Sequence, residues 1–190
     1  GGGLTPVFGG DDAAGLTRTN STNKFCRIGM PHYTNAEEPI ALIYGQVDSG
    51  ASNLHLGGAT GSMNAVENIT FNTAADTTTT SGTERMRITS AGLVGLGESS
   101  PLANLHVRSA DGSGTAATDS DEFMIEGSGH TGMTIIGGTS HSCTISFGDS
   151  GDNNIGYISW DNSSNALSLA ANTTARMVLD ANSRISLSNN

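Results

Sequence analysis

The stretch TERMRITSAGLVGL at residues 83–96 occurs a second time, with substitutions, as TARMVLDANSRISL at residues 174–187. Met86 corresponds to Met177, so the two copies are 177 − 86 = 91 residues apart. Each copy alternates apolar and polar residues on both sides of a short turn, which is the pattern of a β-hairpin with one apolar face. The repetition predicts a chain built from two copies of one β-rich module.

The apolar residues of each hairpin fall on a single face. The first copy places Met86, Ile88, Val94 and Leu96 there, and the second copy places Met177, Leu179, Ile185 and Leu187 there. A two-stranded hairpin of this size is not stable alone in water. We therefore expect its apolar face to pack against other hairpins, either from the same chain or from neighbouring copies.

A second pair of segments lies at the same separation. Residues 53–57 read NLHLG and residues 144–148 read TISFG, again 144 − 53 = 91 positions apart. Two motifs in the same order at one separation favour tandem modules. Repeats of this kind usually build length rather than a catalytic pocket.

Short apolar and β-branched runs, separated by turn residues, continue along the chain after residue 22. No segment shows the periodicity of an amphipathic helix. Regularly spaced short strands are typical of a sandwich, a barrel or a stacked fibre. We predict strands at residues 25–29, 40–44, 53–56, 68–71, 85–89, 93–96, 104–107, 122–125, 134–136, 144–147, 156–160, 166–169, 177–179 and 184–187.

The apolar content of the chain is low. Hydrophobic residues make up 35% of the sequence and aromatic residues 5%, which is less than a globular domain usually contains. Since the apolar residues are concentrated in short runs, we expect a folded β protein with a thin core rather than a disordered chain. A thin core is marginal for a single chain, and burial between subunits would compensate for it.

Charge and hydropathy exclude two classes of partner. The formal net charge is −10, from 18 acidic and 8 basic residues, and Lys24 is the single lysine. Without clustered cations we expect no nucleic-acid-binding surface. No run approaches the roughly 20 apolar residues of a membrane span, and no signal peptide is visible. The chain is expected to be a piece of a longer polypeptide.

Composition divides the chain into three parts. Residues 1–22, rich in Gly, Thr and Asn, are predicted to form a linker or extended arm. Residues 23–108 are predicted to form the first β module and residues 109–190 the second, with a Gly/Ser/Thr/Asp-rich boundary at residues 109–120. The low-complexity run TTTTSG at residues 77–82 predicts a loop insertion in the first module.

The sequence ERMRITSAGLVGLG at residues 84–97, followed by Ser100-Pro101 and by LHV at residues 105–107, resembles a recurring element of bacteriophage tail-fibre proteins. That element reads ERMRI, a turn and VGIG, and then SP and LHV. GMTII at residues 132–136 and IGYI at residues 155–158 also look like strands that precede the element in such fibres. The similarity covers residues 25–190.

In that family these regions are shafts of homotrimeric fibres. The resemblance implies an all-β, elongated fibre of tandem β-hairpin modules, intertwined or packed as a homotrimer and similar to a β-prism or β-helix. The second copy departs from the element, since Val178 replaces Arg87, and Ser186 and Ser188 replace the pair Gly95 and Gly97. The turn of the second hairpin is therefore expected to differ.

The implied function is that of a structural virion fibre, a phage tail or head fibre in the extracellular particle, whose shaft supports attachment to the host. Its partners would be two further copies of the chain, other virion proteins, and a host-surface glycan or protein bound through a distal region. Repeated weak contacts would become strong through multivalency. A bacterial surface adhesin stalk and a polysaccharide-degrading tailspike are the alternatives.

Few residues could bind a metal. His141 and Cys143 are spaced to lie on one face of a strand, where three copies in a trimer could surround an axial metal, but a packed Cys beside a surface His is the preferred interpretation. His106 belongs to the fibre element and is expected to pack or to form hydrogen bonds. The run Asp149–Asn154 could hold calcium, but it lacks the terminal Glu of an EF-hand loop, so a turn is preferred.

No constellation of residues indicates an enzyme. Glu37 and Glu38 are adjacent and would point to opposite faces of a strand, and Glu84 is not kept in the second copy. No nucleophile elbow, phosphate-binding loop or zinc-protease motif is present. We predict no catalytic, metal or cofactor site. We also predict two buried thiols at Cys26 and Cys143, with a disulfide between them as the alternative.

The alternation within residues 83–96 makes a direct prediction about assembly. Ile88→Asp should block oligomer formation, because it places an unpaired charge on the face that must be buried, at a cost of several kcal/mol in each subunit. Thr89→Asp, on the opposite face, should have a mild effect, and it controls for the loss of a β-branched residue. Equal oligomer yields from the two variants would contradict the assignment of faces.

Overall fold

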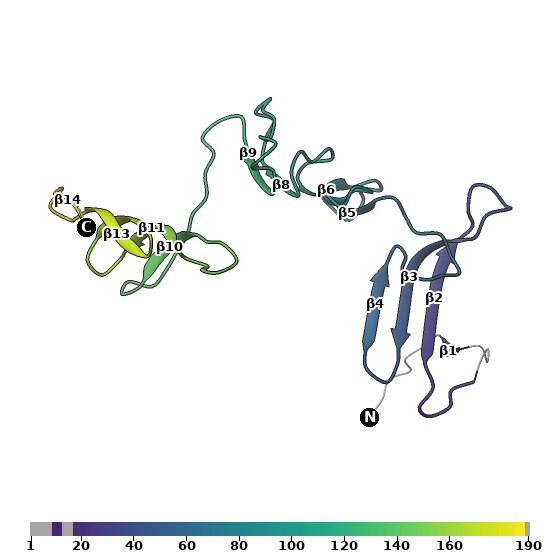
Figure 1. Cartoon of the computed structure of the whole chain (residues 1–190). Helices are drawn as coiled ribbons and strands as arrows, with labels where there is room; N and C mark the ends of the chain where they lie inside the picture. Colours follow the sequence, from purple (N-terminus) through teal and green to yellow (C-terminus); the bar gives the residue numbers. More distant parts are fainter. Residues whose placement is uncertain (1–8, 13–16, 189–190) are drawn as a thin grey trace. The chain divides into compact units, whose positions relative to one another are not determined.

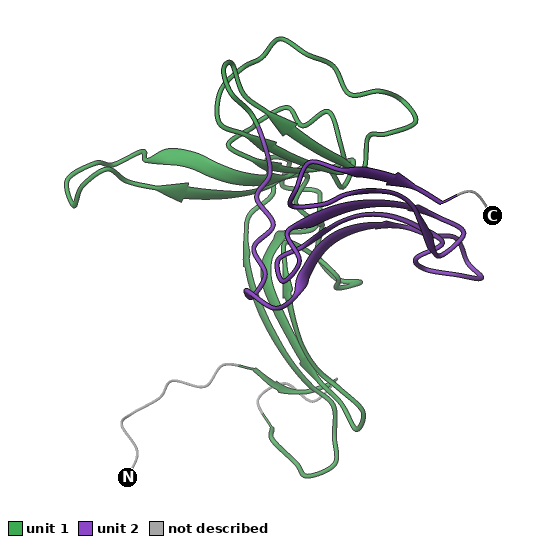
Figure 2. Ribbon diagram, turned by 90° about the vertical axis from the view of Figure 1, so that its left-hand side faces the viewer, with its two compact units in different colours: residues 1–131 green, residues 132–190 purple. Residues whose placement is uncertain are grey.

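The computed structural model describes residues 9–12 and 17–188. Within these residues the chain is all-β, and it has no helix long and apolar enough to cross a membrane. It divides into two compact units, Gly1–Thr131 and Gly132–Asn190 (Figure 2). The first unit holds two sheets and the second holds one.

The first sheet is antiparallel throughout (Figure 1). In the turn between residues 40–47 and residues 52–56, the Asp48 carboxylate accepts hydrogen bonds from the amides of Gly50 and Ala51, as expected for Asp in a turn. In order across the sheet its strands are β1 (Gly10–Asp11), β2 (Lys24–Met30), β3 (Ile40–Val47) and β4 (Ser52–Leu56).

The second sheet combines an antiparallel meander with two parallel strands. Its strands are β5 (Ile69–Thr73), β6 (Thr83–Ile88), β7 (Val94–Leu96), β8 (Leu105–Arg108) and β9 (Phe123–Glu126). The first three are antiparallel, whereas β7, β8 and β9 are mutually parallel. Because parallel strands run in the same direction, the connection between two of them must bring the chain back to the end of the sheet where the first strand began. Loops rather than helices make these connections here.

The third sheet makes up the second unit and is an antiparallel meander. Its strands follow one another in sequence order, so each is joined to its neighbour by a turn or short loop. They are β10 (Ser142–Phe147), β11 (Gly156–Asp161), β12 (Ala166–Ala171), β13 (Thr174–Leu179) and β14 (Ile185–Leu187).

The predicted hairpin repeat is confirmed in its register. Met86 pairs with Leu96 between β6 and β7, and Met177 pairs with Leu187 between β13 and β14. The equivalence extends to the preceding strand, since β5 and β12 carry a register shift at the same place, after Phe71 and after Leu169. The three-strand meanders β5–β6–β7 and β12–β13–β14 are therefore two copies of one unit.

The loop insertion in the first copy is also confirmed. Residues 74–82 connect β5 to β6, whereas residues 172–173 alone connect β12 to β13. The insertion explains why the second proposed motif pair is wrong. Strands before the loop are 169 − 71 = 98 residues apart, so the match of residues 53–57 with residues 144–148 is not structural: β4 is the last strand of its sheet and β10 the first of another.

The remaining predicted strands are present except for one. Residues 134–136 form no strand. Strand β1 was not predicted and lies within the proposed arm at residues 1–22, part of which falls outside the described residues. The proposed boundary between residues 108 and 109 lies between β8 and β9 of one sheet, whereas the division into compact units falls after Thr131.

The substitution of the glycine pair has a steric explanation. In the first copy the chain after Gly97, whose φ is 73°, folds back against β7, so that a Cβ on Gly95 would collide with the carbonyl oxygen of Glu98. Gly97 itself is in the left-handed region that favours glycine. Beside β14 the described chain places no such segment, so Ser186 and Ser188 are accommodated.

The two-residue turn between β12 and β13 contains a strained residue. Asn172 and Thr173 have φ values of 53° and 59°, the combination of a type I′ turn, and a β-branched residue is disfavoured there. Thr173→Gly should therefore stabilise the third sheet by about 1 kcal/mol, measured as a rise in the melting temperature. Asn165→Gly is the control, because Asn165 (φ 51°) already tolerates the left-handed region. Equal changes in melting temperature for the two variants would contradict the assignment of strain to Thr173.

Candidate functional site

The apolar residues of the second sheet form two continuous rows across all five strands. Because paired residues in adjacent strands lie side by side on one face, the strand register defines these rows directly. One row is Ile69, Ile88, Val94, Leu105 and Phe123, and the other is Phe71, Met86, Leu96, Val107 and Ile125.

The third sheet presents the same arrangement. One row is Cys143, Trp160, Leu167, Leu179 and Ile185, and the other is Ile145, Ile158, Leu169, Met177 and Leu187. Its opposite face carries mostly small or polar residues, with Tyr157 and Val178 among them. On this face Thr144 and Ser159 are joined by a hydrogen bond of 2.8 Å. The alternation predicted for the repeated hairpin therefore extends across the whole sheet.

Neither apolar face is covered within its own unit. None of the row residues is classed as buried, and Leu187 at the edge is 75% exposed. The buried apolar residues Ala41, Pro101 and Ala103 of the described chain lie outside these rows. Each sheet is a single layer in the isolated chain.

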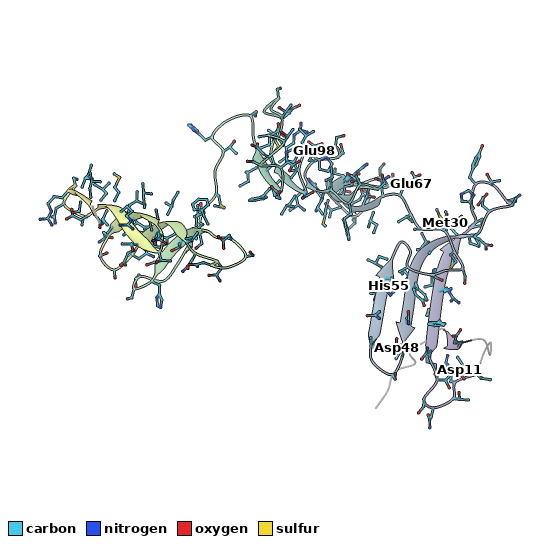
Figure 3. The ribbon with its side chains drawn as sticks, viewed as in Figure 1. Asp11, Met30, Asp48, His55, Glu67 and Glu98 are labelled. Atoms are coloured by element: carbon cyan, nitrogen blue, oxygen red, sulfur yellow. The ribbon has the colours of Figure 1, made fainter. Side chains whose placement is uncertain are left out.

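The first sheet has one face with aromatic and polar side chains and one apolar face. Tyr44 stacks on His55 with ring centroids 5.3 Å apart, and the Arg27 guanidinium lies 5.4 Å from the Tyr44 ring centroid. These side chains cover one another, so Tyr44 is buried although no second layer faces it. His55 is labelled in Figure 3. The other face of the sheet carries exposed apolar residues, namely Ile28, Ile43, Val47, Leu54 and Leu56.

A buried cluster of charged side chains lies on the polar face of the second sheet. His106 is completely buried, and Glu98 (labelled in Figure 3) and Glu126 are nearly so. The Nε2 of His106 lies 3.0 Å from Oε2 of Glu126. Arg108 forms an ion pair with Glu98 and lies 3.6 Å from Glu126. These four side chains come from β8, β9 and the loop after β7.

Local structure explains why these residues meet. His106 and Arg108 alternate with apolar residues on β8 and so share its polar face, and Glu126 pairs with Arg108 in the parallel register. The amide of Gly112 donates a hydrogen bond of 2.7 Å to Glu126 Oε1. Two chain segments thus fold over the sheet and exclude water from this part of its polar face.

The geometry of this cluster fits an internally paired ion cluster better than a metal centre. One ligand atom each from Glu98, His106 and Glu126 lies within 4.8 Å of the others, a set that could bind a divalent cation. However, the Leu102 amide donates to Nδ1 of His106 at 3.4 Å, so we infer that Nε2 carries the proton. A metal ligand would need the opposite tautomer, and Arg108 already supplies a cation.

The proposed axial metal ligands are not gathered within one chain. Cys143 belongs to an apolar row, and its sulfur accepts a long hydrogen bond of 3.8 Å from Asn162. Cys26 and Cys143 are free thiols, as preferred from the sequence, but both are only partly buried rather than buried. Among the described residues no group of three potential metal ligands includes His141 or Cys143.

The acidic run at residues 149–154 is built as a turn. The Asp149 carboxylate accepts hydrogen bonds from the amides of Gly151 and Asp152 at 2.7 and 3.0 Å, and these bonds lower the pKa of Asp149. Oδ1 of Asp149 is thus already hydrogen-bonded to the backbone of its own turn.

The glutamates weighed as catalytic candidates do not approach one another as a pair of acids. Glu84 forms a bidentate pair with Arg87 at 2.8 Å, and that guanidinium lowers the pKa of Glu84. Glu37 and Glu38 lie in the loop between β2 and β3 rather than on a strand. No catalytic geometry involving these residues is seen in the described chain.

The sequence did not identify Glu98, Arg108 and Glu126. Only the parallel pairing of β8 with β9 and the folding of the loop after β7 bring them together. For Arg108 and Glu126 the available signal was a charged residue within an apolar strand, at the position that alternation assigns to the opposite face. Glu98 lies in the loop after β7 and carries no such signal. Alternation alone does not say whether that face is wet or covered.

A scan against protein-family models finds no match for this chain, and a search of curated proteins finds none either.

The buried cluster predicts unequal roles for two arginines of the same sheet. Arg108→Met should destabilise the chain by about 3–5 kcal/mol, because it leaves two buried carboxylates without a cation. Arg87→Met should have a much smaller effect, since its partner Glu84 is partly exposed and solvent screens the pair. Urea unfolding of both variants measures the difference.

A second substitution tests the cause. Glu98→Gln introduced together with Arg108→Met should recover part of the lost stability, because it removes one of the uncompensated charges. Equal losses for Arg108→Met and Arg87→Met, or no recovery in the double variant, would contradict the assignment of the cluster as a buried ion network.

Proposed function

We propose that this chain is a structural segment of a virion fibre, a tail or head fibre in the extracellular particle, which assembles as a homotrimer through its apolar sheet faces. The single observation that carries the proposal is the uncovered pair of apolar rows on the second and third sheets. A surface of this size on a chain with so few buried apolar residues calls for a partner layer.

The energetics favour assembly over an isolated monomer. Fully burying one Leu, Ile, Met or Phe side chain contributes about 1.5–3 kcal/mol, and each of these faces carries ten side chains in its rows. The polar faces are hydrogen-bonded or occupied by charged groups, so they can remain in water. The apolar faces are the ones that must find partners.

Three copies related by a rotation axis provide such partners. Equivalent apolar faces would meet at the axis, and the polar faces would point outward, as in a β-prism. The repeated meander supports a shaft, because the same unit can place an equivalent apolar face at two levels along one chain. The resemblance of residues 84–107 to tail-fibre shafts points to the same assembly.

The proposed role is mechanical and adhesive. A shaft holds a distal receptor-binding region away from the particle, and three copies held together turn weak contacts with a host glycan or protein into strong attachment. Other virion proteins would anchor the fibre. A bacterial surface adhesin stalk would use the same physical construction and differs in being attached to a cell rather than a particle.

A polysaccharide-degrading tailspike is the alternative outside this class. The buried Glu98 and Glu126 do not favour it, since both contact Arg108 and lie under folded segments rather than in an open groove. Incubation with capsular or lipopolysaccharide glycans should release no reducing ends. Release that a single carboxylate substitution abolishes would replace the fibre proposal with the tailspike.

Adjacent residues of β13 provide a matched test of the assembly. Met177 lies in an apolar row, whereas Val178 lies on the opposite face and pairs with Ser168 and Ser186. Sedimentation of the unmodified chain should give a trimer. Met177→Asp should reduce the trimer fraction by at least tenfold, because each subunit would bury an unpaired charge and the three charges would repel one another near the axis.

Val178→Asp is the control for this experiment. It introduces the same charge and loses a β-branched residue, but on the polar face, so the trimer should persist. A stable folded monomer of the unmodified chain, or equal sensitivity of assembly to both substitutions, would overturn the proposed packing of apolar faces.

A further inference from the structure

The segment Gly132–Gly138 at the start of the second unit is extended but unpaired. Its sequence, GMTIIGG, places apolar and β-branched residues between glycines, a composition typical of a strand. Nevertheless none of these residues belongs to a strand of the described chain. In Figure 2 the segment appears as a purple trace outside the strands of its unit.

The exposure of this segment is high for its composition. Met133 is 56% exposed, Ile135 is 45% exposed and Ile136 is 89% exposed. In the described chain, residues 132–137 form no backbone hydrogen bond. Apolar side chains and unpaired backbone groups in one short stretch are the two features that β-strand addition to a sheet edge satisfies together.

The β14 edge of the third sheet lies too far away for the segment of the same chain, which precedes the other edge strand, β10. The His141 amide donates to the Gly138 carbonyl at 3.0 Å, which holds the segment near β10. Strand β14 is four strands away, about 19 Å at the usual spacing of strands. Ile136 is two residues from Gly138, a reach of about 7 Å.

The edge of β14 is chemically prepared for another strand. Arg184 and Ser188 direct their backbone groups toward β13, since the Arg184 carbonyl accepts from Asp180 and the Ser188 amide donates to Arg176. By alternation, Ile185 directs its amide and carbonyl outward, as does Leu187. Both residues are also strongly exposed at the ends of the apolar rows.

The equivalent edge in the second sheet is occupied. There β7, the counterpart of β14, pairs in parallel with β8, whose Leu105 and Val107 extend the two apolar rows. Met133 and Ile135 have the same spacing, with one intervening residue, as Leu105 and Val107. Added to β14 in the same register, they would continue its rows in the same way.

We propose that residues Met133–Ile136 of one copy add as a strand to β14 of a second copy of this chain. Each copy carries one such segment and one such edge, so the contact is head-to-tail and closes when the copies form a ring. In a trimer all three segments and all three edges are then paired. This inference rests on the proposed homotrimer and specifies a strand exchange within it.

Cross-linking in isotopically mixed assemblies tests the pairing. A photo-reactive amino acid replaces Ile136, and trimers are assembled from equal amounts of light and heavy chains. Trypsin cleaves after Arg184, so the expected product joins the segment to the peptide that follows Arg184, in mixed light–heavy pairs. Cross-links confined to one chain, or directed to β10, would overturn the strand exchange.

A proline substitution provides a second measurement. Thr134→Pro costs no hydrogen bond within one chain, because residue 134 forms no backbone hydrogen bond there. In the exchanged strand residue 134 takes the place of His106 on β8, whose neighbours Leu105 and Val107 pair with β7, so the proline removes a donor to β14. The trimer should dissociate at about tenfold higher concentration. Thr115→Pro is the control, since Thr115 is exposed, lies outside any strand and follows a glycine; it should leave the trimer unchanged.

The outcomes separate this inference from the proposed function. A trimer that forms normally with Thr134→Pro and shows no mixed cross-links to β14 would overturn the strand exchange and leave the fibre proposal standing. A chain that sediments as a folded monomer would overturn the fibre proposal, and the strand exchange with it.

Discussion

The apolar faces of the three sheets are the constraint on which the rest of this chain depends. A sheet is stable when its apolar face is removed from water by a second layer, and no unit of this chain supplies such a layer for the two-row faces. The hydrophobic contribution grows with the area removed from water. Each of these faces therefore calls for a partner layer, and the repeated meander presents such a face in two of the sheets.

Comparison of the two copies of the meander shows which substitutions the repeated unit tolerates. The apolar rows are present in both, whereas the ion pair of Glu84 and Arg87 is replaced by Ala175 and Val178. A partly exposed ion pair contributes little to stability, so its absence from the second copy destabilises that copy only slightly. A binding or catalytic site would depend on particular polar groups, whereas a shaft depends on the geometry of its rows.

The buried cluster around His106 lies on a covered part of the second sheet's polar face, and the third sheet has no such cover in the described chain. In the second sheet the chain after β7 folds back over the polar face, which requires Gly95 and Gly97 and isolates Glu98 and Glu126 from water. Replacing a buried ion network with apolar residues is often neutral for stability, whereas removing one partner from it is costly. The third sheet keeps the meander without this cover, and the proposed strand exchange would complete its free edge from outside.

The sequence by itself determined the all-β class, nearly every strand, the hairpin repeat, the inserted loop and the apolar side of each repeated hairpin, because periodicity and turn chemistry are local. The tertiary structure decided the rest. An offset shared by residues 53–57 and 144–148 suggested an equivalence that the strand pairing does not contain, and residues 134–136 look like a strand but have no partner within the chain. The cluster of Glu98, Arg108 and Glu126 also depends on pairing between distant segments, since a residue's burial is set by what folds over it and not by its neighbours in sequence.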